Sequence, residues 1–318
     1  MDNELIDVVI TSRVEQGTGV AVFELTRENG EALPEFSAGA HIDVHCADDL
    51  VRQYSLCNDP ASSEMYRIGV LNDPNSRGGS VKIHAEFAEQ QTIKISAPRN
   101  HFPLNKAGDK SILVGGGIGI TPMIAMAYEL VGMQKDFELH YCLRTKGVGA
   151  FEDELIAAFG PRVHFHYDDQ DPTQLFSPDV NLHPSHPDTH VYVCGPSGFM
   201  DWVIEGAKTL KYQSENIHFE YFSAEVDTSG DSFEVYCEQS DITVTVGSED
   251  TIAKALQQAG IKVSMSCEEG VCGTCITDVI EGVPDHRDHF LTDEEKEDND
   301  QIALCCSRAK CERLVIDL

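Results

Sequence analysis

Short runs of alternating apolar and polar residues fill the first third of the chain. Clusters of Gly, Pro, Asn and Asp separate these runs. Alternation with a period of two is typical of half-buried β-strands, and several short strands at close spacing are typical of a small barrel. We therefore predict an antiparallel β-barrel over residues 1–105. Its strands are expected at residues 5–14, 19–27, 41–46, 51–56, 65–71 and 92–97.

The pattern changes between residues 106 and 223, where short apolar runs alternate with longer segments of helical periodicity. The apolar runs are 111–117, 137–143, 163–167, 190–195 and 216–222, and the helical segments are 121–131, 150–159 and 197–210. This alternation is typical of βαβ units, in which helices cover a parallel sheet. The second predicted domain is an α/β nucleotide-binding fold.

Residues 224–231 are small and polar, which predicts a linker before a third domain at 232–318. Two strand patterns open that domain, and a strand pattern at 313–318 closes it. A helix is expected over 248–260, with its apolar positions spaced i, i+3, i+4 and i+7. Ser248 is its predicted N-cap and Gly260 its predicted C-cap.

Composition excludes several functions. The chain has 54 acidic and 23 basic residues, a net charge of −31. Binding to nucleic acid or to an anionic membrane surface requires a basic face, so we expect neither. The first residues lack the pattern of a secretory signal, and no run of about 18 apolar residues predicts a membrane span. These features favour a soluble, cytoplasmic protein.

The cysteines carry the strongest chemical signal. There are 11 of them, and an odd number in a chain without a secretory signal argues against a disulfide framework. Four of them follow the spacing C-x₄-C-x₂-C-x₂₉-C, which matches the plant-type [2Fe–2S] pattern. The predicted ligands are Cys267, Cys272, Cys275 and Cys305.

Three alternatives to this assignment remain. Zinc usually takes pairs of C-x₂-C, of which the cluster region has one, and buried structural thiols would need no metal. Cys306 competes with Cys305 for the fourth position, although the spacing favours Cys305. Gly270 and Gly273 are expected to let the backbone approach the sulfurs and direct N–H groups at them.

Two glycine-rich turns each precede a predicted helix. In the first turn, Gly78, Gly79 and Ser80 suit a phosphate at a helix N-terminus, unless Ser80 is a simple N-cap. The second turn, residues 115–119, lacks the third glycine of G-x-G-x-x-G because residue 120 is Ile. There Thr121 is the expected N-cap and Pro122 the first helical residue.

The cysteine loop, together with "DHRDHFLTDEE" at 285–295 and "CCSRA" at 305–309, resembles the ferredoxin domain of the phthalate dioxygenase reductase family. The resemblance extends over essentially the whole chain. It implies a flavin-binding barrel, an NAD-binding domain and a ferredoxin domain, in this order. It also implies the reductase component of a Rieske oxygenase. Members that serve vanillate demethylases and carnitine monooxygenases look most similar, and the C-terminal tail slightly favours the carnitine type.

The resemblance assigns roles to flavin-site residues. Arg52 would pair with the flavin phosphate, Tyr54 would pack on the isoalloxazine ring, and Ser55 would hydrogen-bond its N5 edge. The strand residues that would border the flavin are Gly69, Val70 and Leu71. The family arrangement implies FMN, while the residues themselves leave FAD open.

The nucleotide site is implied by two further segments. Cys194, Gly195 and Pro196 match the family's second nucleotide segment, although Cys194 could also be a buried strand thiol. Phe222 would cover the flavin, or else be a core aromatic residue. The first segment comprises Gly115, Gly116, Gly117, Gly119 and Thr121. Few basic residues, Lys146 and Arg162, occur between 145 and 207, which favours NADH over NADPH.

The expected reaction is electron transfer from NADH through FMN and the cluster to a terminal oxygenase. The cofactors supply the redox chemistry, so no catalytic side chain is assigned. Two alternatives are a non-enzymatic ferredoxin-type carrier and a reductase for another acceptor, such as a di-iron hydroxylase. The acidic segment 293–300 is either a solvated helix or loop, or a docking site for a basic partner surface.

Overall fold

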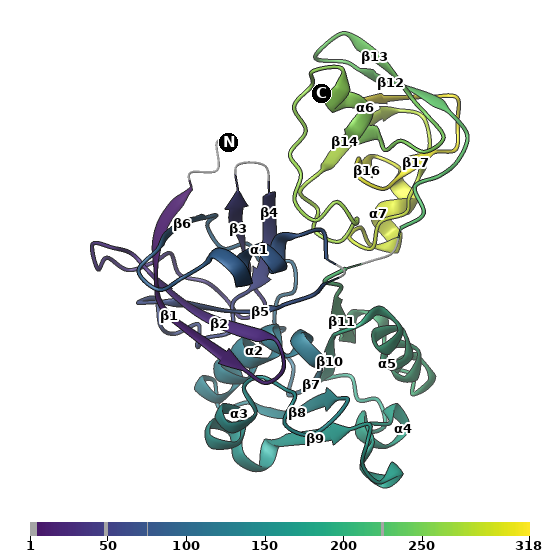
Figure 1. Cartoon of the computed structure of the whole chain (residues 1–318). Coiled ribbons are helices and arrows are strands. Elements are labelled where there is room, and N and C mark those ends of the chain that lie inside the picture. Colours follow the sequence, from purple (N-terminus) through teal and green to yellow (C-terminus); the bar gives the residue numbers. More distant parts are fainter. Residues whose placement is uncertain (1–4, 48–49, 75, 224–225) are drawn as a thin grey trace. The chain divides into compact units, whose positions relative to one another are not determined.

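The computed structural model describes residues 5–47, 50–74, 76–223 and 226–318. The chain forms two compact units, Met1–Phe222 and Ser223–Leu318. The first unit contains an antiparallel sheet and a parallel sheet, and the second contains a smaller mixed sheet (Figure 1). The predicted multidomain fold class is confirmed in all three of its parts.

The antiparallel sheet has the strand order β4-β3-β6-β1-β2-β5. A bridge between Leu56, just after β4, and Ile68 of β5 joins the two edges into a barrel. The alternating residues point inward and form one apolar core. The elements are β1 (Ile6–Gln16), β2 (Val20–Thr26), β3 (His41–Ala47), β4 (Leu50–Ser55), β5 (Tyr66–Leu71), α1 (Gly79–Glu86) and β6 (Thr92–Ile95).

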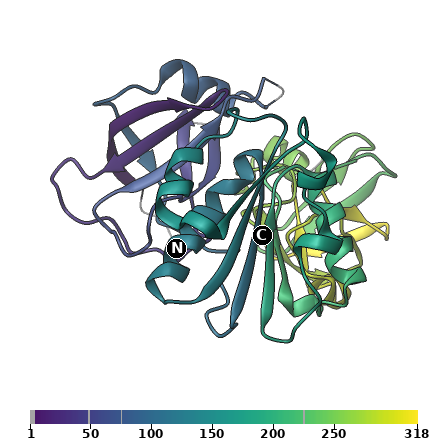
Figure 2. The ribbon, with the colours of Figure 1, turned by 90° about the horizontal axis from the view of Figure 1, so that it is seen from below.

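The parallel sheet has the strand order β11-β10-β7-β8-β9, and helices cover both of its faces (Figure 2). The interior strand β10 is buried along its whole length, as expected for a strand between two helical layers. The strands are β7 (Lys110–Gly116), β8 (Asp136–Leu143), β9 (Val163–Tyr167), β10 (Thr189–Cys194) and β11 (Ile217–Glu220). The α-helices are α2 (Ile120–Gly132), α3 (Glu152–Phe159), α4 (Pro178–Asn181) and α5 (Ser197–Thr209). Short 3₁₀ turns lie at Gly117–Gly119, Gly160–Arg162, Pro172–Gln174 and Ser214–Asn216.

The register of this sheet fixes which residues meet at its carboxyl edge. Gly115 of β7 pairs with Cys194 of β10, and Cys194 pairs with Glu220 of β11. The carboxyl edge of a parallel sheet is where ligands bind in open α/β folds. The glycine turn and the Cys194 segment, which lie far apart in the sequence, are therefore neighbours.

The second unit packs a helix against a sheet of order β13-β12-β18-β14-β16. A separate two-stranded ladder joins β15 to β17. The strands are β12 (Phe233–Cys237), β13 (Ile242–Val246), β14 (Ile276–Glu281), β15 (Pro284–Asp285), β16 (Gln301–Ala303), β17 (Arg308–Ala309) and β18 (Arg313–Ile316). The helices are α6 (Ile252–Gln258) and α7 (Asp293–Asp298).

Three predicted helix starts are wrong. The N-cap of α6 is Thr251 rather than Ser248, because the Thr251 hydroxyl accepts from the Lys254 N–H. Helix α2 begins one residue before Thr121, whose hydroxyl instead donates to the Ile118 carbonyl at 3.0 Å. The alternative that Ser80 caps α1 is also wrong, because the cap position is Gly78.

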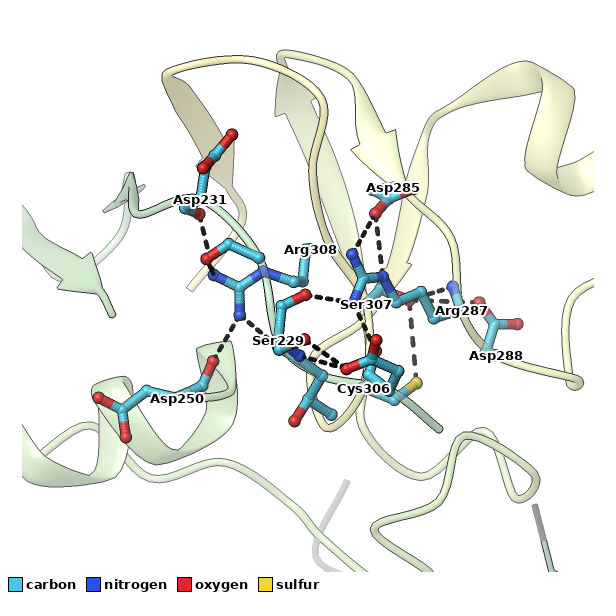
Figure 3. A network of polar contacts seen from close by, with 12 residues as sticks. Ser229, Asp231, Asp250, Asp285, Arg287, Asp288, Cys306, Ser307 and Arg308 are labelled. Carbon is cyan, nitrogen blue, oxygen red and sulfur yellow. Dashed lines mark hydrogen bonds and ion pairs between the residues drawn. The ribbon is translucent and has the colours of Figure 1, made fainter. Parts of the chain in front are cut away.

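The described part of the predicted linker, residues 226–231, is held by two arginines of the second unit (Figure 3). Arg287 donates to the carbonyls of Asp227 and Ser229. Arg308, which is 2% exposed, donates to the carbonyls of Thr228 and Asp231 at 2.6 and 2.9 Å. Residues 227–231 are therefore bound to this unit, and residues 224–225 lie outside the described residues.

Candidate functional site

Three of the four predicted cluster cysteines lie in the loop between α6 and β14, and the fourth follows β16. All four are buried. The Cys267 thiol contacts those of Cys272 and Cys305, and the Cys275 thiol contacts that of Cys305. The chain thus brings four sulfurs together although Cys305 is far from the others in sequence.

Backbone N–H groups surround the Cys267 sulfur. The amides of Glu269 and Val271 each donate to it at 3.4 Å, and the Cys267 amide donates to the Cys272 sulfur at 3.5 Å. Hydrogen bonds from the Cys272 and Cys305 thiols, followed by these amides, lower the pKa of Cys267. Thiolates are the form that binds iron, so this environment favours ligation.

The four thiols are the donor set that a two-iron cluster requires. A structural zinc would hold four ligands around one point. A [2Fe–2S] cluster instead distributes four thiolates over two irons.

The two loop glycines have a structural role that differs in part from the predicted one. Gly270 and Gly273 both have φ of +70°, a left-handed conformation that other residues rarely adopt. A Cβ on Gly273 would lie 2.3 Å from the Phe290 ring, and one on Gly270 would lie 2.6 Å from the Cys306 sulfur. The glycines therefore allow close packing beneath the loop, where Cys306 is 1% exposed.

Residues 285–290 hold the cysteine loop in place through hydrogen bonds. Asp288 accepts from the amides of Phe290 and Leu291, and the His289 amide donates to the Gly270 carbonyl at 2.9 Å. Ser307, next to Cys306, donates to the Asp288 carboxylate at 3.4 Å (Figure 3). The motifs at 285–295 and 305–309, on which the family resemblance rests, therefore help to hold the cysteine loop in place.

The predicted phosphate site lies at the start of α1. Gly78 has φ of +86° and no atom within 4 Å of where a Cβ would stand, so the backbone there is open. A Cβ on Gly79 would lie 2.4 Å from the Arg52 side chain. The guanidinium of Arg52 donates to the carbonyls of Val51 and Arg77. Arg52 thus lies beside an open helix N-terminus, a suitable place for a phosphate.

The other predicted flavin residues are arranged on two strands and at the end of the first unit. On β5, Gly69 faces Phe151 and Thr121, whereas the Val70 side chain is buried in the barrel core. Leu71 and Phe222 are each 37% exposed. Tyr54 on β4 is half-buried, and burial raises its pKa. The Val70 side chain is therefore closed to a ligand, and the Val70 carbonyl oxygen contacts Nε2 of His84 at 2.8 Å.

The two nucleotide segments contact each other tightly. A Cβ on Gly119 would lie 2.3 Å from the Cys194 carbonyl oxygen. A Cβ on Gly116 would touch Pro196 and Phe199, and one on Gly195 would touch Gly116. Gly117, at φ of +55°, faces open space. Such a turn exposes backbone N–H groups at the carboxyl edge of the sheet, where a pyrophosphate can approach.

One charged residue at this edge was not predicted. Glu220 ends β11, and its carboxylate is hydrogen-bonded to Ser55 of the barrel. It also lies near the buried Cys194 thiol and 3.9 Å from His41. The sequence does place an acidic residue at the end of a predicted strand. It does not show that Glu220 contacts residues of β3 and β4, because that contact depends on the tertiary structure.

The histidines of the parallel sheet pair with one another. His140 and His166 are 3.0 Å apart between ring nitrogens, and His190 and His218 are 2.9 Å apart. Among the described residues they form no metal site. A separate finding is that no helix in the described ranges is long and apolar enough to cross a membrane.

Comparisons with known proteins cover the whole chain. A family described as a 2Fe-2S iron-sulfur cluster binding domain matches residues 235–310. Vanillate O-demethylase oxidoreductase of Pseudomonas sp. is 45% identical over 99% of this chain and 100% of its own length. The carnitine monooxygenase reductase subunit of Acinetobacter baumannii is 39% identical over 99% of this chain and 98% of its own. The structure of phthalate dioxygenase reductase, described as modular for electron transfer from pyridine nucleotides to [2Fe-2S], superimposes with a TM-score of 0.77. It is 38% identical, covering 100% of this chain and 99% of that one.

Proposed function

Because this chain belongs to the oxygenase reductase family that includes phthalate dioxygenase reductase, we propose that it transfers electrons from NADH to a terminal Rieske oxygenase through FMN and a [2Fe–2S] cluster. The single observation that carries the proposal is the 45% identity to vanillate O-demethylase oxidoreductase over the full length of both chains. The chain is an oxidoreductase, and the alternative of a non-enzymatic carrier is rejected.

Features of the first unit support FMN as the flavin and NADH as the electron donor. The barrel has one open helix N-terminus beside an arginine, at Gly78 and Arg52, which suits a single terminal phosphate. Lys146 and Arg162 are the only Lys or Arg residues between 145 and 207 of the sequence. A 2′-phosphate favours nearby arginine, so this scarcity supports NADH.

The oxygenase partner is proposed to be of the vanillate O-demethylase type. The identity to that reductase, 45%, exceeds the 39% to the carnitine monooxygenase reductase. This ranking differs from the slight preference for the carnitine type that the C-terminal tail gave. A reductase of this family passes electrons to the oxygenase and need not contact the oxygenase's substrate. The proposal therefore concerns which oxygenase docks with this chain.

The residues of this chain position and insulate the electron carriers. When bound, the flavin accepts a hydride and the cluster accepts single electrons. Arg52 and the α1 N-terminus would hold the flavin phosphate, while Ser55 on β4 would face its reactive edge. The 115–119 turn and Cys194 would place the nicotinamide at the carboxyl edge of the parallel sheet. The buried thiols of the second unit would hold the cluster.

The test is reconstitution with purified components. We expect the protein to hold one FMN, two irons and two acid-labile sulfides, and to oxidise NADH in preference to NADPH. It should support turnover by a vanillate O-demethylase oxygenase better than turnover by a carnitine monooxygenase oxygenase. FAD in the released flavin, or equal rates with both oxygenases, would contradict the respective part of the proposal.

A further inference from the structure

The second unit contains an open pocket that the proposed reaction does not use. The pocket has a volume of about 490 Å³, and residues next to the β15–β17 ladder and at the end of α7 form its walls. The residues that line it are Val283, His286, Lys296, Glu297, Asn299 and Lys310. Two lysines and a histidine therefore meet at one place in a chain whose net charge is −31.

The two lysines of the pocket do not neutralise carboxylates. Over the described residues 226–318, the ion pairs of Lys and Arg are those of Lys254 and Arg287, so Lys296 and Lys310 form none. Lys296 is flanked by acidic residues along α7, yet its ammonium donates to the Asp288 carbonyl at 2.8 Å. Both ammonium groups therefore keep a positive charge that no carboxylate of this unit offsets by direct contact.

The histidine of the pocket is a buried polar group that lacks a partner. Its side chain is 7% exposed, and neither ring nitrogen of His286 has a partner at hydrogen-bond distance. Nδ1 lies 3.8 Å from the Asp288 carboxylate, which is too far for a hydrogen bond. Buried polar atoms are nearly always paired, so a ring that lines a pocket in this state indicates a bound acceptor.

We propose that this pocket binds a doubly charged oxyanion, either free phosphate or the phosphate group of a small organic molecule. Lysine binds phosphate as a point charge, and a protonated histidine donates from both ring nitrogens. Two lysines and a protonated His286, opposed by Glu297, leave a net charge of +2, which such an anion neutralises. Val283 is 44% exposed and adds an apolar wall for an organic part.

The charges around His286 predict that a proton binds together with the anion. Burial is the main cause that lowers its pKa, and Lys296 and Lys310 lower it further, against the raising effects of Asp288 and the Lys296 backbone. The charged groups that face the ring or share its pocket are these three and Glu297. An anion beside the ring favours its protonated form. Binding should consequently tighten as pH falls from about 8 to about 6.

The first test measures sulfate binding to the holoprotein by isothermal titration calorimetry at constant ionic strength. Sulfate carries two charges throughout this pH range. We expect Lys310→Gln to weaken binding about fivefold or more, because one charge-assisted contact is lost. Lys262→Gln, which removes the same charge from an exposed position after α6, should stay within about twofold of wild type. Equal weakening in both variants, or no saturable binding by wild type, would overturn the proposal.

Removing the negative charge of the pocket should have the opposite effect. Glu297→Gln should tighten sulfate binding about threefold, because a carboxylate that repels the anion is lost. Glu294→Gln, in the same helix but outside the pocket lining, is the control and should leave the affinity unchanged. A structural defect does not strengthen binding, and the iron content of each variant checks its fold. An unchanged affinity in Glu297→Gln contradicts the proposed site.

The pH dependence tests the part of the ring. Wild-type affinity for sulfate should rise about threefold or more from about pH 8 to about pH 6, and His286→Gln should lose this rise. The same rise in both proteins would exclude His286 from the site. If His286→Gln loses its iron and does not fold, Lys310→Gln and Glu297→Gln still decide the proposal.

The nature and place of the anion are tested on the same holoprotein. At about pH 8, where both carry two charges, tighter binding of glycerol phosphate than of phosphate supports an organic ligand, and the reverse supports the free anion. Acetate that binds as tightly as sulfate would overturn the assignment to a doubly charged anion. In crystals soaked with selenate, we expect the anomalous signal between His286, Lys296 and Lys310. A signal confined to the glycine turns of the first unit would overturn the proposal.

Discussion

The residues around the predicted cluster show how single positions determine whether a metal site can form. The Cys305 thiol contacts those of Cys267, Cys275 and Cys306, and the Cys306 sulfur lies under the loop against Gly270. Adjacent residues of an irregular segment point in different directions, so one of the two thiols reaches the other cysteines and its neighbour fills the core.

This difference predicts opposite effects for two neighbouring substitutions. Cys305→Ser should abolish the cluster, because a hydroxyl is a poor replacement for a thiolate ligand. Cys306→Ser should retain two irons and two sulfides per chain, since that sulfur packs without ligating. Iron and acid-labile sulfide assays on both purified variants test this. Iron that survives in Cys305→Ser and is lost in Cys306→Ser would show that the ligand assignment is reversed.

A matched pair of glycines separates backbone strain from crowding. Gly273 at φ +70° faces the Phe290 ring, while Gly260 at φ +82° has nothing within 4 Å of a Cβ. Gly260→Ala should lower the free energy of unfolding by about 1–2 kcal/mol through the left-handed conformation alone. Gly273→Ala should cost a further 1–3 kcal/mol or so from overpacking and reduce iron content. Equal losses of stability in the two variants, measured by urea unfolding of the second unit, would exclude a role for the ring.

At the scale of elements, the strands of the parallel sheet carry two histidine pairs, in which three rings are buried and that of His218 is half-buried. His140 and His166 join β8 to β9, and His190 and His218 join β10 to β11. Each hydrogen bond between ring nitrogens requires one ring to accept, so at least that ring must be neutral. Burial is the main cause that lowers the pKa of His166 and His218, each to about 4.

The histidine pairs predict that the first unit loses stability in mild acid. The unfolded histidine binds a proton near pH 6.5, whereas the folded one does so near pH 4, so stability is full above about pH 6.5 and falls as pH decreases towards 4. The loss should be on the order of 1–3 kcal/mol per ring. His218→Gln should reduce the loss between pH 7.5 and 5, and the exposed control His186→Gln should not. Urea unfolding followed by the fluorescence of Trp202, the one tryptophan of the chain, reports this unit.

Helix α7 carries the acidic segment that could dock a basic partner. Its start is fixed by a capping box in which Thr292 accepts from Glu295 and the Glu295 carboxylate accepts from Thr292. Glu295 therefore has a structural role, which the sequence-based docking hypothesis did not distinguish from the roles of its neighbours. Glu294 and Glu297, two of the exposed acids of this segment, are suited to a docking test because neither takes part in the capping box.

Replacing Glu294 and Glu297 by Gln should slow electron delivery to the oxygenase at low salt. Charge steering acts on association and is screened over about 8 Å at physiological ionic strength, so the defect should diminish as salt is raised. NADH–ferricyanide activity should not change. The control is Glu234→Gln with Glu238→Gln, the same charge change at exposed positions in β12 and directly after it. If both pairs slow delivery equally, total charge and not α7 is responsible.

At the scale of the whole molecule, the two compact units divide the chain between Phe222 and Ser223. The proposed flavin and nucleotide residues lie in the first unit and the cysteines in the second. Each unit has its own apolar core, so each has the buried surface needed to fold.

A protein ending at residue 222 should therefore retain half of the reaction. We expect it to reduce ferricyanide with NADH at close to the full-length rate, because that path ends at the flavin. It should fail to support the oxygenase, since single-electron delivery needs the cluster. Stopped-flow reduction and coupled oxygenase assays measure the two activities, and oxygenase turnover at the full-length rate would mean that electrons bypass the cluster.

The sequence predicted most reliably those features that depend on residues close together along the chain. Three of the four cysteines are close together, and the strand patterns reflect a local period, so both could be recognised directly. Glu220 could not be assigned, because its role depends on β11 lying beside β10 and facing Ser55 of the barrel. The hydrogen bonds from Arg308 to residues 228 and 231 were missed for the same reason, and the start of α2 at Ile120, capped by Gly119, was also missed. The ligand roles of the site residues remain predictions.

The long separation between Cys275 and Cys305 makes the cluster a cross-link as well as an electron carrier. Binding both cysteines closes a loop of about 30 residues, and in the loop-entropy description a closure of this length disfavours the unfolded chain by about 3–4 kcal/mol. Iron loading and folding of the second unit are then one coupled equilibrium. Iron limitation or oxidative loss of the cluster would consequently remove the protein's activity and also expose this part of the chain to proteolysis.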